Sequence, residues 1–297
     1  MSSKPTKATV AGRVYLELRR LALAEGRTTD ELHQLYALEG FLVRLAASKY
    51  RSRLVLKGGA LLAAYDVRRA TRDLDFQARR FSGAPGSVLT AVRAIAAVPR
   101  SDGLAFGDRE ATARPIREDD EYQGVRVMLP CTLASARVGF GIDVNVGDPI
   151  WPSPEPVTLS RLLGGTIVLS GYPLHMVHAE KIVTAFQRGT ASTRWRDFAD
   201  LYLLSGRHSV SGDNLGRAIA EVAGFRRAPK VSLATALDGY STVGEARWVF
   251  WRRAARLEAR LPASFGEVLA AVMAFADPVI EARVAGKAWD PATRSWG

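Results

Sequence analysis

The chain has 297 residues, of which 47% are hydrophobic and 24% charged, and its formal net charge is +11. No apolar run approaches the length of about 18 residues that indicates a transmembrane helix, and the single cysteine, Cys131, excludes an internal disulfide and a cysteine-based zinc site. The N-terminus lacks a secretory signal pattern, so we expect a cytoplasmic protein with no membrane association. The strong positive charge favours a polyanionic partner.

The first half of the sequence alternates between helical and strand patterns. Apolar residues recur at helical spacing in some segments, and Val- and Ile-rich alternation marks others as strands. In chain order we expect helices over residues 10–23 and 29–48, a buried strand over 54–57, a short helix directly after it, a strand beginning at 73, a helix over 87–98, and three strands within 107–146.

The Pro-rich connection GDPIWPSPEP is our candidate domain boundary. We therefore predict one domain over residues 1–150 and a second over 151–297. From about Leu174 onward the pattern is almost entirely helical. The predicted fold class is α/β (α+β), with a small mixed sheet followed by a mostly helical C-terminal domain.

Two aspartates, Asp73 and Asp75, stand one residue apart in the predicted strand DLDF. Strand alternation places both carboxylates on one face while Leu74 and Phe76 face the core. Like charges this close repel unless a cation lies between them, and paired carboxylates bind Mg²⁺. Asp143, a single acid within the apolar strand GFGIDVNV, is a candidate third ligand. From spacing alone, an exposed strand edge explains these acids equally well.

The turn Lys57-Gly58-Gly59 ends a strand and opens a helix, so its backbone amides can approach a phosphate. It matches neither the Walker pattern nor the dinucleotide-binding fingerprint. A Gly-Gly pair alone is weak support for a phosphate site. The position of this pair just before two aspartates strengthens that support.

Two predicted helices carry further candidates. Lys181 shares a helix face with Arg188, and Asp197 and Asp200 share a face of the next helix. A plain ion pair between helices is one interpretation, and contact with a triphosphate is the other. His178 lacks the acidic neighbours of a metalloprotease motif and is predicted to be a packing or surface residue.

A basic stretch, RWVFWRRAARLEAR, places three arginines in one predicted helical row. A solvated helix face and a surface that follows phosphates both explain such a row. Because the whole chain is strongly basic, we favour RNA binding by Arg252, Arg256 and Arg260.

In their order, these motifs resemble the nucleotidyltransferase fold shared with DNA polymerase β. More narrowly, they resemble the AbiEii family of toxin nucleotidyltransferases of type IV toxin–antitoxin pairs. The resemblance rests on LVLKGGALLAAYDVRRATRDLDF, YQGVRVMLPCTLASARVGFGIDVNVGDP and HAEKIVTAFQRGTASTRWRDFADLYLL, and it covers about half of the chain, from residue 54 to 204.

The resemblance implies a site, a reaction and partners. It implies transfer of a nucleoside monophosphate from an NTP to an RNA acceptor, with the 3′ end of tRNA as the expected target, a block of translation, and a cognate antitoxin. The expected cofactor is Mg²⁺ (two ions), with Mn²⁺ as an alternative. The implied residues are the metal ligands Asp73, Asp75 and Asp143, the catalytic Lys181 and Asp197, and the nucleotide-binding Lys57, Gly58, Gly59, Arg69, Thr71, Lys181, Arg188 and Asp200.

Three other functions compete with this one. The same site could attach a nucleotide to a protein hydroxyl, in which case acceptor binding would depend weakly on salt. A small-molecule acceptor such as an aminoglycoside is cationic, and the basic chain argues against it. In a non-enzymatic nucleic-acid-binding protein the aspartates would be dispensable.

Overall fold

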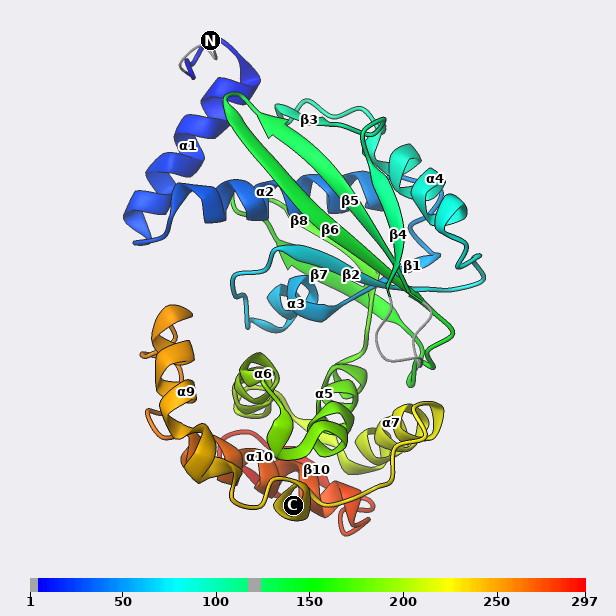
Figure 1. The fold of residues 1–297 in the computed structure, drawn as a ribbon, viewed down its shortest axis with the longest axis vertical. Coiled ribbons are helices and arrows are strands. Elements are labelled where there is room, and N and C mark those ends of the chain that lie inside the picture. Colours follow the sequence, from blue (N-terminus) through cyan, green and yellow to red (C-terminus); the bar gives the residue numbers. More distant parts are fainter. Residues whose placement is uncertain (1–4, 117–123) are drawn as a thin grey trace. The chain divides into compact units, whose positions relative to one another are not determined.

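The computed structural model describes residues 5–116 and 124–297, which form a mixed α/β fold, as predicted (Figure 1). The chain divides into two compact units. The first comprises the chain up to Gly147 together with Glu155–Gly171, and the second comprises Asp148–Pro154 together with Tyr172–Gly297. This division differs from the boundary predicted between residues 150 and 151, because two strands after that boundary join the sheet of the first unit.

Within the described residues, eight strands form one mixed sheet in the first unit, which is larger than the small sheet predicted. The strand order is β3-β5-β6-β2-β1-β8-β7, and β4 pairs with the free side of part of β5. The central strand β2 runs antiparallel to β1 and parallel to β6. The strands are β1 (Leu54–Lys57), β2 (Asp73–Ala78), β3 (Leu104–Phe106), β4 (Thr112–Ile116), β5 (Gly124–Leu133), β6 (Ala136–Val146), β7 (Glu155–Ser160) and β8 (Thr166–Gly171).

The helices of the first unit agree closely with their predicted ranges: α1 (Val10–Ala24), α2 (Thr29–Ala46), α3 (Gly58–Leu61) with a 3₁₀ turn after it (Leu62–Tyr65), and α4 (Pro85–Ala96). The hydroxyl of Thr28 accepts a hydrogen bond from the Glu31 amide at 3.2 Å and so caps the N-terminus of α2. Helix α2 packs against β6, β8 and α4. Its Phe41 and Leu45 are fully buried, so this helix forms the centre of the core.

The second unit is mostly helical, as predicted: α5 (Leu174–Arg188), a 3₁₀ turn (Gly189–Ala191), α6 (Trp195–Ser205), α7 (Gly212–Phe225), α8 (Leu233–Ala236), α9 (Tyr240–Ala254) and α10 (Phe265–Ile280). The sequence did not predict its small sheet of β9 (Val210–Ser211), β10 (Ala288–Asp290) and β11 (Ser295–Trp296). Phe275 of α10 packs against Trp289 and Trp296, with ring centroids 5.0 and 5.7 Å away, and this contact joins that sheet to the helical core. In the part of the chain that the structure describes, no helix is long and apolar enough to cross a membrane.

Candidate active site

Asp73 and Asp75 lie on the same face of β2, as the alternation predicted. Leu74 and Phe76 on the opposite face are fully buried, whereas both aspartates are partly exposed. The apolar face of the sheet packs on α2, where Phe41 lies 6.2 Å from Phe140 of β6 between ring centroids. The two carboxylates are therefore presented on the face of the sheet that points away from α2.

The Gly-Gly turn packs directly against this acidic strand. Gly58 has φ +67°, and a Cβ at this position would lie 2.0 Å from Oδ2 of Asp75. A Cβ at Gly59 would lie 2.9 Å from the hydroxyl of Thr71 and 3.2 Å from Nη1 of Arg69. Gly58 is therefore required for the close approach of the turn to Asp75, whereas a Cβ at Gly59 would make the Thr71 and Arg69 side chains shift. The predicted contact of the turn with a phosphate stays a prediction.

Asp143 lies on the strand next to the aspartate pair. In the parallel register of β2 and β6, Asp75 stands beside Asp143, and Asp73 stands beside Gly141, whose amide donates to Oδ1 of Asp73 at 3.0 Å. On the other side of β2, Lys57 pairs with Asp75 in the antiparallel register and is only 7% exposed. Register partners share a face, so three predicted carboxylates and one predicted lysine lie on the same face of the sheet.

Arg126 of β5 engages the third carboxylate. Its Nε and Nη2 donate to the two oxygens of Asp143 at 2.7 and 2.6 Å, a bidentate ion pair. These hydrogen bonds raise the pKa of Arg126 above its ordinary value, burial opposes them, and the negative charges of Asp143, Asp73 and Asp75 raise it further. One guanidinium thus responds to all three carboxylates.

The donor set suits a hard divalent cation in its chemistry, because it consists of carboxylate oxygens. Among the described residues, however, no group of three His, Cys, Asp or Glu side chains is assembled as a metal-binding cluster. Asp143 gives both oxygens to Arg126 instead. Asp73 and Asp75 fit the two-carboxylate part of a metal site, and Asp143 could join them with its remaining lone pairs or by exchanging Arg126 for the metal. The assignment of all three as metal ligands stays a prediction.

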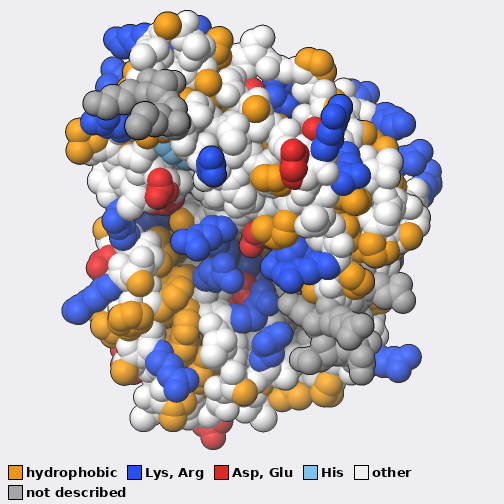
Figure 2. All heavy atoms as spheres, turned by 45° about the horizontal axis from the view of Figure 1, so that its top comes forward, with side chains coloured by type: hydrophobic (Ala, Val, Ile, Leu, Met, Phe, Trp, Pro, Cys, Tyr) orange, Lys and Arg blue, Asp and Glu red, His pale blue; other side chains and the backbone are white. Residues whose placement is uncertain are grey.

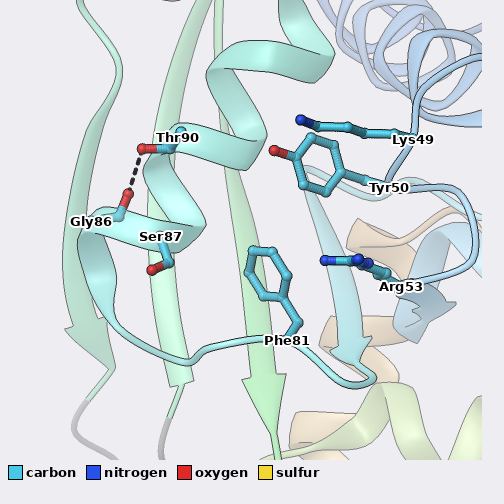
Figure 3. A pocket seen from close by; sticks show the side chains of 7 residues that line it. All are labelled: Lys49, Tyr50, Arg53, Phe81, Gly86, Ser87 and Thr90. Atoms are coloured by element: carbon cyan, nitrogen blue, oxygen red, sulfur yellow. Dashed lines mark hydrogen bonds between the residues drawn. The ribbon is translucent and has the colours of Figure 1, made fainter.

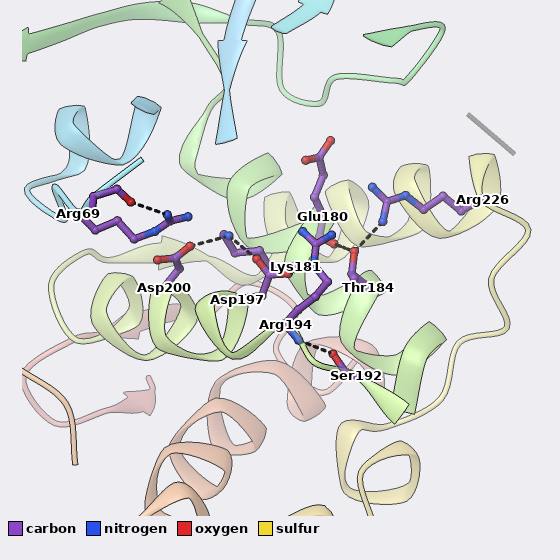
Figure 4. A network of polar contacts seen from close by, with 10 residues as sticks. Arg69, Glu180, Lys181, Thr184, Ser192, Arg194, Asp197, Asp200 and Arg226 are labelled. Carbon is purple, nitrogen blue, oxygen red and sulfur yellow. Dashed lines mark hydrogen bonds and ion pairs between the residues drawn. The ribbon is translucent and has the colours of Figure 1, made fainter. Parts of the chain in front are cut away.

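In the second unit, Lys181 of α5 connects two aspartates of α6 (Figure 4). Its Nζ donates to Asp197 and to Asp200, at 2.8 Å in each case, and Arg194 donates to the other oxygen of Asp197. Asp200 is 1% exposed and Asp197 is 6% exposed. The predicted lysine and aspartates are therefore brought together as a buried network of charges.

The pKa of Asp197 follows from this network. Burial alone would raise the pKa, but the charges of Lys181 and Arg194 and their hydrogen bonds outweigh burial and hold the pKa of Asp197 below its ordinary value. Asp197 is therefore ionised at neutral pH and is a poor proton acceptor. Its geometry suits the positioning of Lys181.

Two other residues of α5 have different environments. Arg188 is exposed in the last turn, where it is accessible to solvent. His178 is fully buried, as its predicted packing role requires, and its ring lies 4.8 Å from that of Phe275. Within the described residues, neither ring nitrogen of His178 has a hydrogen-bond partner, and burial lowers its pKa to about 3.

The predicted helical row of three arginines is wrong. Helix α9 ends at Ala254, and Arg256 has φ +55°, which a continuing helix does not allow. Arg252 turns its guanidinium onto the chain after the helix, donating to the carbonyls of Leu261 and Glu258 at 2.9 and 2.8 Å. Arg252, Arg256 and Arg260 therefore do not share a helix face, and their role in RNA binding stays a prediction.

Sequence reasoning missed Arg126, which pairs with Asp143 in the first unit, and Arg194, which pairs with Asp197 in the second. Arg126 had a usable signal, since it is the only charged residue in the described strand β5. No sequence signal identified Asp143 as the partner of Arg126, because the β5–β6 register that places these two residues opposite each other depends on the turn between the strands. Arg194 lies just before α6 and three residues from Asp197, a spacing that suits a local ion pair.

Comparison with known proteins finds solved structures with a similar fold and one matching sequence family. The fold is similar to the crystal structure of JHP933 from Helicobacter pylori, with 15% identity and a TM-score of 0.50 over 87% of this chain and 95% of that chain. A second H. pylori structure, described as a candidate nucleotidyltransferase, aligns with 15% identity and a TM-score of 0.49 over 87% of this chain and 98% of that one. No curated protein matches the sequence.

The family is decided by the sequence match rather than by solved structures, because the JHP933 structure, at 15% identity, supports the fold alone. Residues 40–274 match the family described as "Nucleotidyl transferase AbiEii toxin, Type IV TA system". This range covers most of the chain and includes the aspartate strands, the Gly-Gly turn and the Lys181 network. The chain therefore belongs to the AbiEii family of nucleotidyltransferase toxins of type IV toxin–antitoxin systems.

Proposed function

We propose that this protein is a metal-dependent enzyme that transfers a nucleoside monophosphate from an NTP to the 3′ end of tRNA and so blocks translation. The observation that supports this most strongly is the placement of Asp73 and Asp75 side by side on β2, with Asp143 in register on β6. Paired carboxylates on adjacent strands suit the binding of divalent cations that act on phosphoryl groups.

In this proposal Asp73 and Asp75 would hold Mg²⁺ (two ions, with Mn²⁺ as an alternative), and Asp143 would be the third ligand, next to Arg126. The bound metal would neutralise negative charge on the triphosphate and would lower the pKa of the acceptor hydroxyl. The acceptor oxygen forms a bond to the α-phosphorus while the bond to the β-phosphate breaks. Pyrophosphate leaves, and the hydroxyl proton passes to water.

The remaining candidates bind the NTP. The amides of the Gly58–Gly59 turn and the side chains of Lys57, Arg69 and Thr71 are proposed phosphate contacts in the first unit. Lys181 is the proposed triphosphate contact in the second unit, with Arg188 as a further cation. Asp197 and Asp200 hold the ammonium of Lys181 in place through their 2.8 Å hydrogen bonds.

An RNA acceptor is favoured by charge. The chain carries a net charge of +11, and Lys and Arg side chains are prominent on the face drawn in Figure 2. Polyanions are attracted to such a surface, whereas a cationic acceptor such as an aminoglycoside is repelled. Arg252, Arg256 and Arg260 are proposed RNA contacts, individually rather than as one row. We further propose a cytoplasmic location, where tRNA is present, and a cognate antitoxin encoded nearby.

The proposal is tested by incubating the purified protein with total RNA, Mg²⁺ and each α-labelled NTP separately. The expected result is label in a tRNA-sized band, lost when Mg²⁺ is chelated. Label on protein alone would assign a protein hydroxyl as the acceptor. RNA binding with no label in any fraction would assign a non-enzymatic nucleic-acid-binding role.

A further inference from the structure

A pocket lies in the first unit between the start of α4 and the segments that flank β1 and β2 (Figure 3). Its volume is about 460 Å³, and its lining includes Lys49, Tyr50, Arg53 and Phe81. In Figure 3 the side chains of Lys49, Tyr50 and Arg53 point toward Phe81 and α4. The pocket thus combines two cations with two aromatic rings.

The pocket is separate from the carboxylates. Leu54 pairs with Ala78 at the pocket end of β1 and β2, whereas Lys57 pairs with Asp75 at the other end. Lys57 lies four positions after Arg53, a distance of about 13 Å along an extended strand. A ligand in the pocket therefore occupies a different site from the proposed NTP.

The cations of the pocket belong to a larger basic patch. Its members come from the segments 49–53 and 79–80 and are all exposed: Lys49, Arg51, Arg53, Arg79 and Arg80. In the part of the chain that the structure describes, their side chains form no ion pair with a carboxylate and no hydrogen bond. Their positive charge is therefore available to a partner, unlike that of Arg126 or Lys181.

The aromatic rings give the patch a second property. Tyr50 and Phe81 are partly exposed, and their rings meet edge to face with centroids 6.1 Å apart and planes at 86°. Lys49 Nζ lies 5.4 Å from the centroid of the Tyr50 ring. Partly exposed rings next to unpaired cations are the combination that binds single-stranded nucleic acid, since bases stack on the rings and phosphates contact the cations.

We propose that this surface, the 49–53/79–80 patch with its pocket, binds a single-stranded segment of RNA, with a base stacked against Phe81 or Tyr50 and the adjoining phosphates at Lys49 and Arg53. The five cations extend beyond the pocket and exceed what one mononucleotide can contact, which favours a strand. An acidic peptide would match the charge but would leave the rings without a stacking partner. The identity of the strand as the acceptor rests on the proposed function, but the binding does not.

The test measures the affinity of a labelled single-stranded oligouridylate for the full chain at several salt concentrations, without NTP or metal. Three variants are compared with the wild type: Lys49→Gln/Arg53→Gln, Phe81→Leu, and the matched control Arg19→Gln/Arg20→Gln, which removes the same charge from exposed positions of α1. Thermal unfolding of each variant checks the fold.

Lys49→Gln/Arg53→Gln should bind the oligouridylate more weakly than the wild type does. The slope of log affinity against log salt should decrease by about 1.4, since each of the two lost phosphate contacts contributes about 0.7. Phe81→Leu should weaken binding about tenfold without changing the slope, because it removes stacking and no charge. The α1 control should retain wild-type affinity and slope.

Wild-type affinity and slope in both pocket variants would overturn the inference. The inference would also be overturned, in favour of an acidic protein partner, by two results together: polyglutamate competes for the patch as well as RNA does, and Phe81→Leu binds the oligouridylate as tightly as the wild type. The proposed function fails separately: a protein that binds RNA through this patch but never incorporates label retains the inference and loses the transfer reaction.

Discussion

Arg126 holds both carboxylate oxygens of Asp143, at 2.7 and 2.6 Å, while Asp143 stands in register with Asp75 on the adjacent strand. The guanidinium supplies positive charge to a group of carboxylates that would otherwise repel one another. A divalent cation bound to the same carboxylates must compete with Arg126 for Asp143. This competition links metal affinity to a residue that is not itself a ligand.

Replacing Arg126 should therefore change metal binding. Arg126→Gln should raise the affinity for Mn²⁺ severalfold, because it removes a positive charge next to the carboxylates and frees Asp143. The same variant should unfold at a lower temperature without metal, since Asp143 is then left partly buried and unpaired, and Mn²⁺ should restore most of the loss. Mn²⁺ titration followed by electron paramagnetic resonance measures the affinity directly.

The matched control is Arg114→Gln, which removes an arginine that is the register partner of Arg126 on β4. Within the described part of the chain, Arg114 forms no hydrogen bond or ion pair with Asp143, so its loss should change Mn²⁺ affinity less than the loss of Arg126. Equal Mn²⁺ affinity in wild type and Arg126→Gln would contradict the assignment of Asp143 as a metal ligand.

The conservative variant Lys181→Arg distinguishes a structural role of Lys181 from a role in NTP binding. Lys181→Ala leaves the buried Asp197 and Asp200 without their shared ammonium and should destabilise the protein by about 3 kcal/mol, which obscures any effect on binding. Lys181→Arg keeps the charge and should fold, but its planar guanidinium should bind the triphosphate several times more weakly than a compact ammonium. Calorimetric NTP titration, together with the unfolding temperature, measures both effects. Unchanged NTP affinity in Lys181→Arg would reduce this network to a structural ion pair.

His178 should make stability depend on pH. Its folded-state pKa of about 3 lies below the ordinary value of 6.5, so between these values the unfolded chain binds a proton that the folded chain does not. The contribution of His178 to the free energy of unfolding is therefore fully present above pH 6.5 and is lost progressively as the pH decreases below that value. In His178→Leu this part of the dependence should disappear. Urea unfolding at pH 7 and pH 5 tests it, and equal pH dependence in both proteins would contradict it.

Local patterns predicted the acidic strand well. The alternation of Asp73 and Asp75 with Leu74 and Phe76 needs only the period of a strand, and the structure has the same two faces. Strand β1 was predicted to the residue because Gly58 ends it. In such segments the side chains themselves determine the local conformation.

Pairings between distant segments could not be predicted in the same way. Strand β8 belongs to the first unit because Gly171 pairs with Leu56, and no local pattern near residue 171 indicates that partner. The same holds for Arg126 and Asp143, whose contact depends on the β5–β6 register. The prediction of one helical row of C-terminal arginines was wrong for a different reason. The helical period of the sequence continues past Ala254, but Arg252 donates to carbonyls beyond the helix and Arg256 adopts a left-handed conformation.

The central claim is that the β2 carboxylates support nucleotidyl transfer to RNA, and it is tested most directly by Asp75→Asn. Asparagine keeps the shape that packs against Gly58 and removes the charge that would bind metal. Transfer of label from an α-labelled NTP to tRNA is measured for wild type and variant at equal RNA occupancy and with matched unfolding temperatures. Transfer should fall by about three orders of magnitude, the effect of losing several kcal/mol of transition-state stabilisation. Labelling of tRNA by Asp75→Asn at the wild-type rate would contradict the claim.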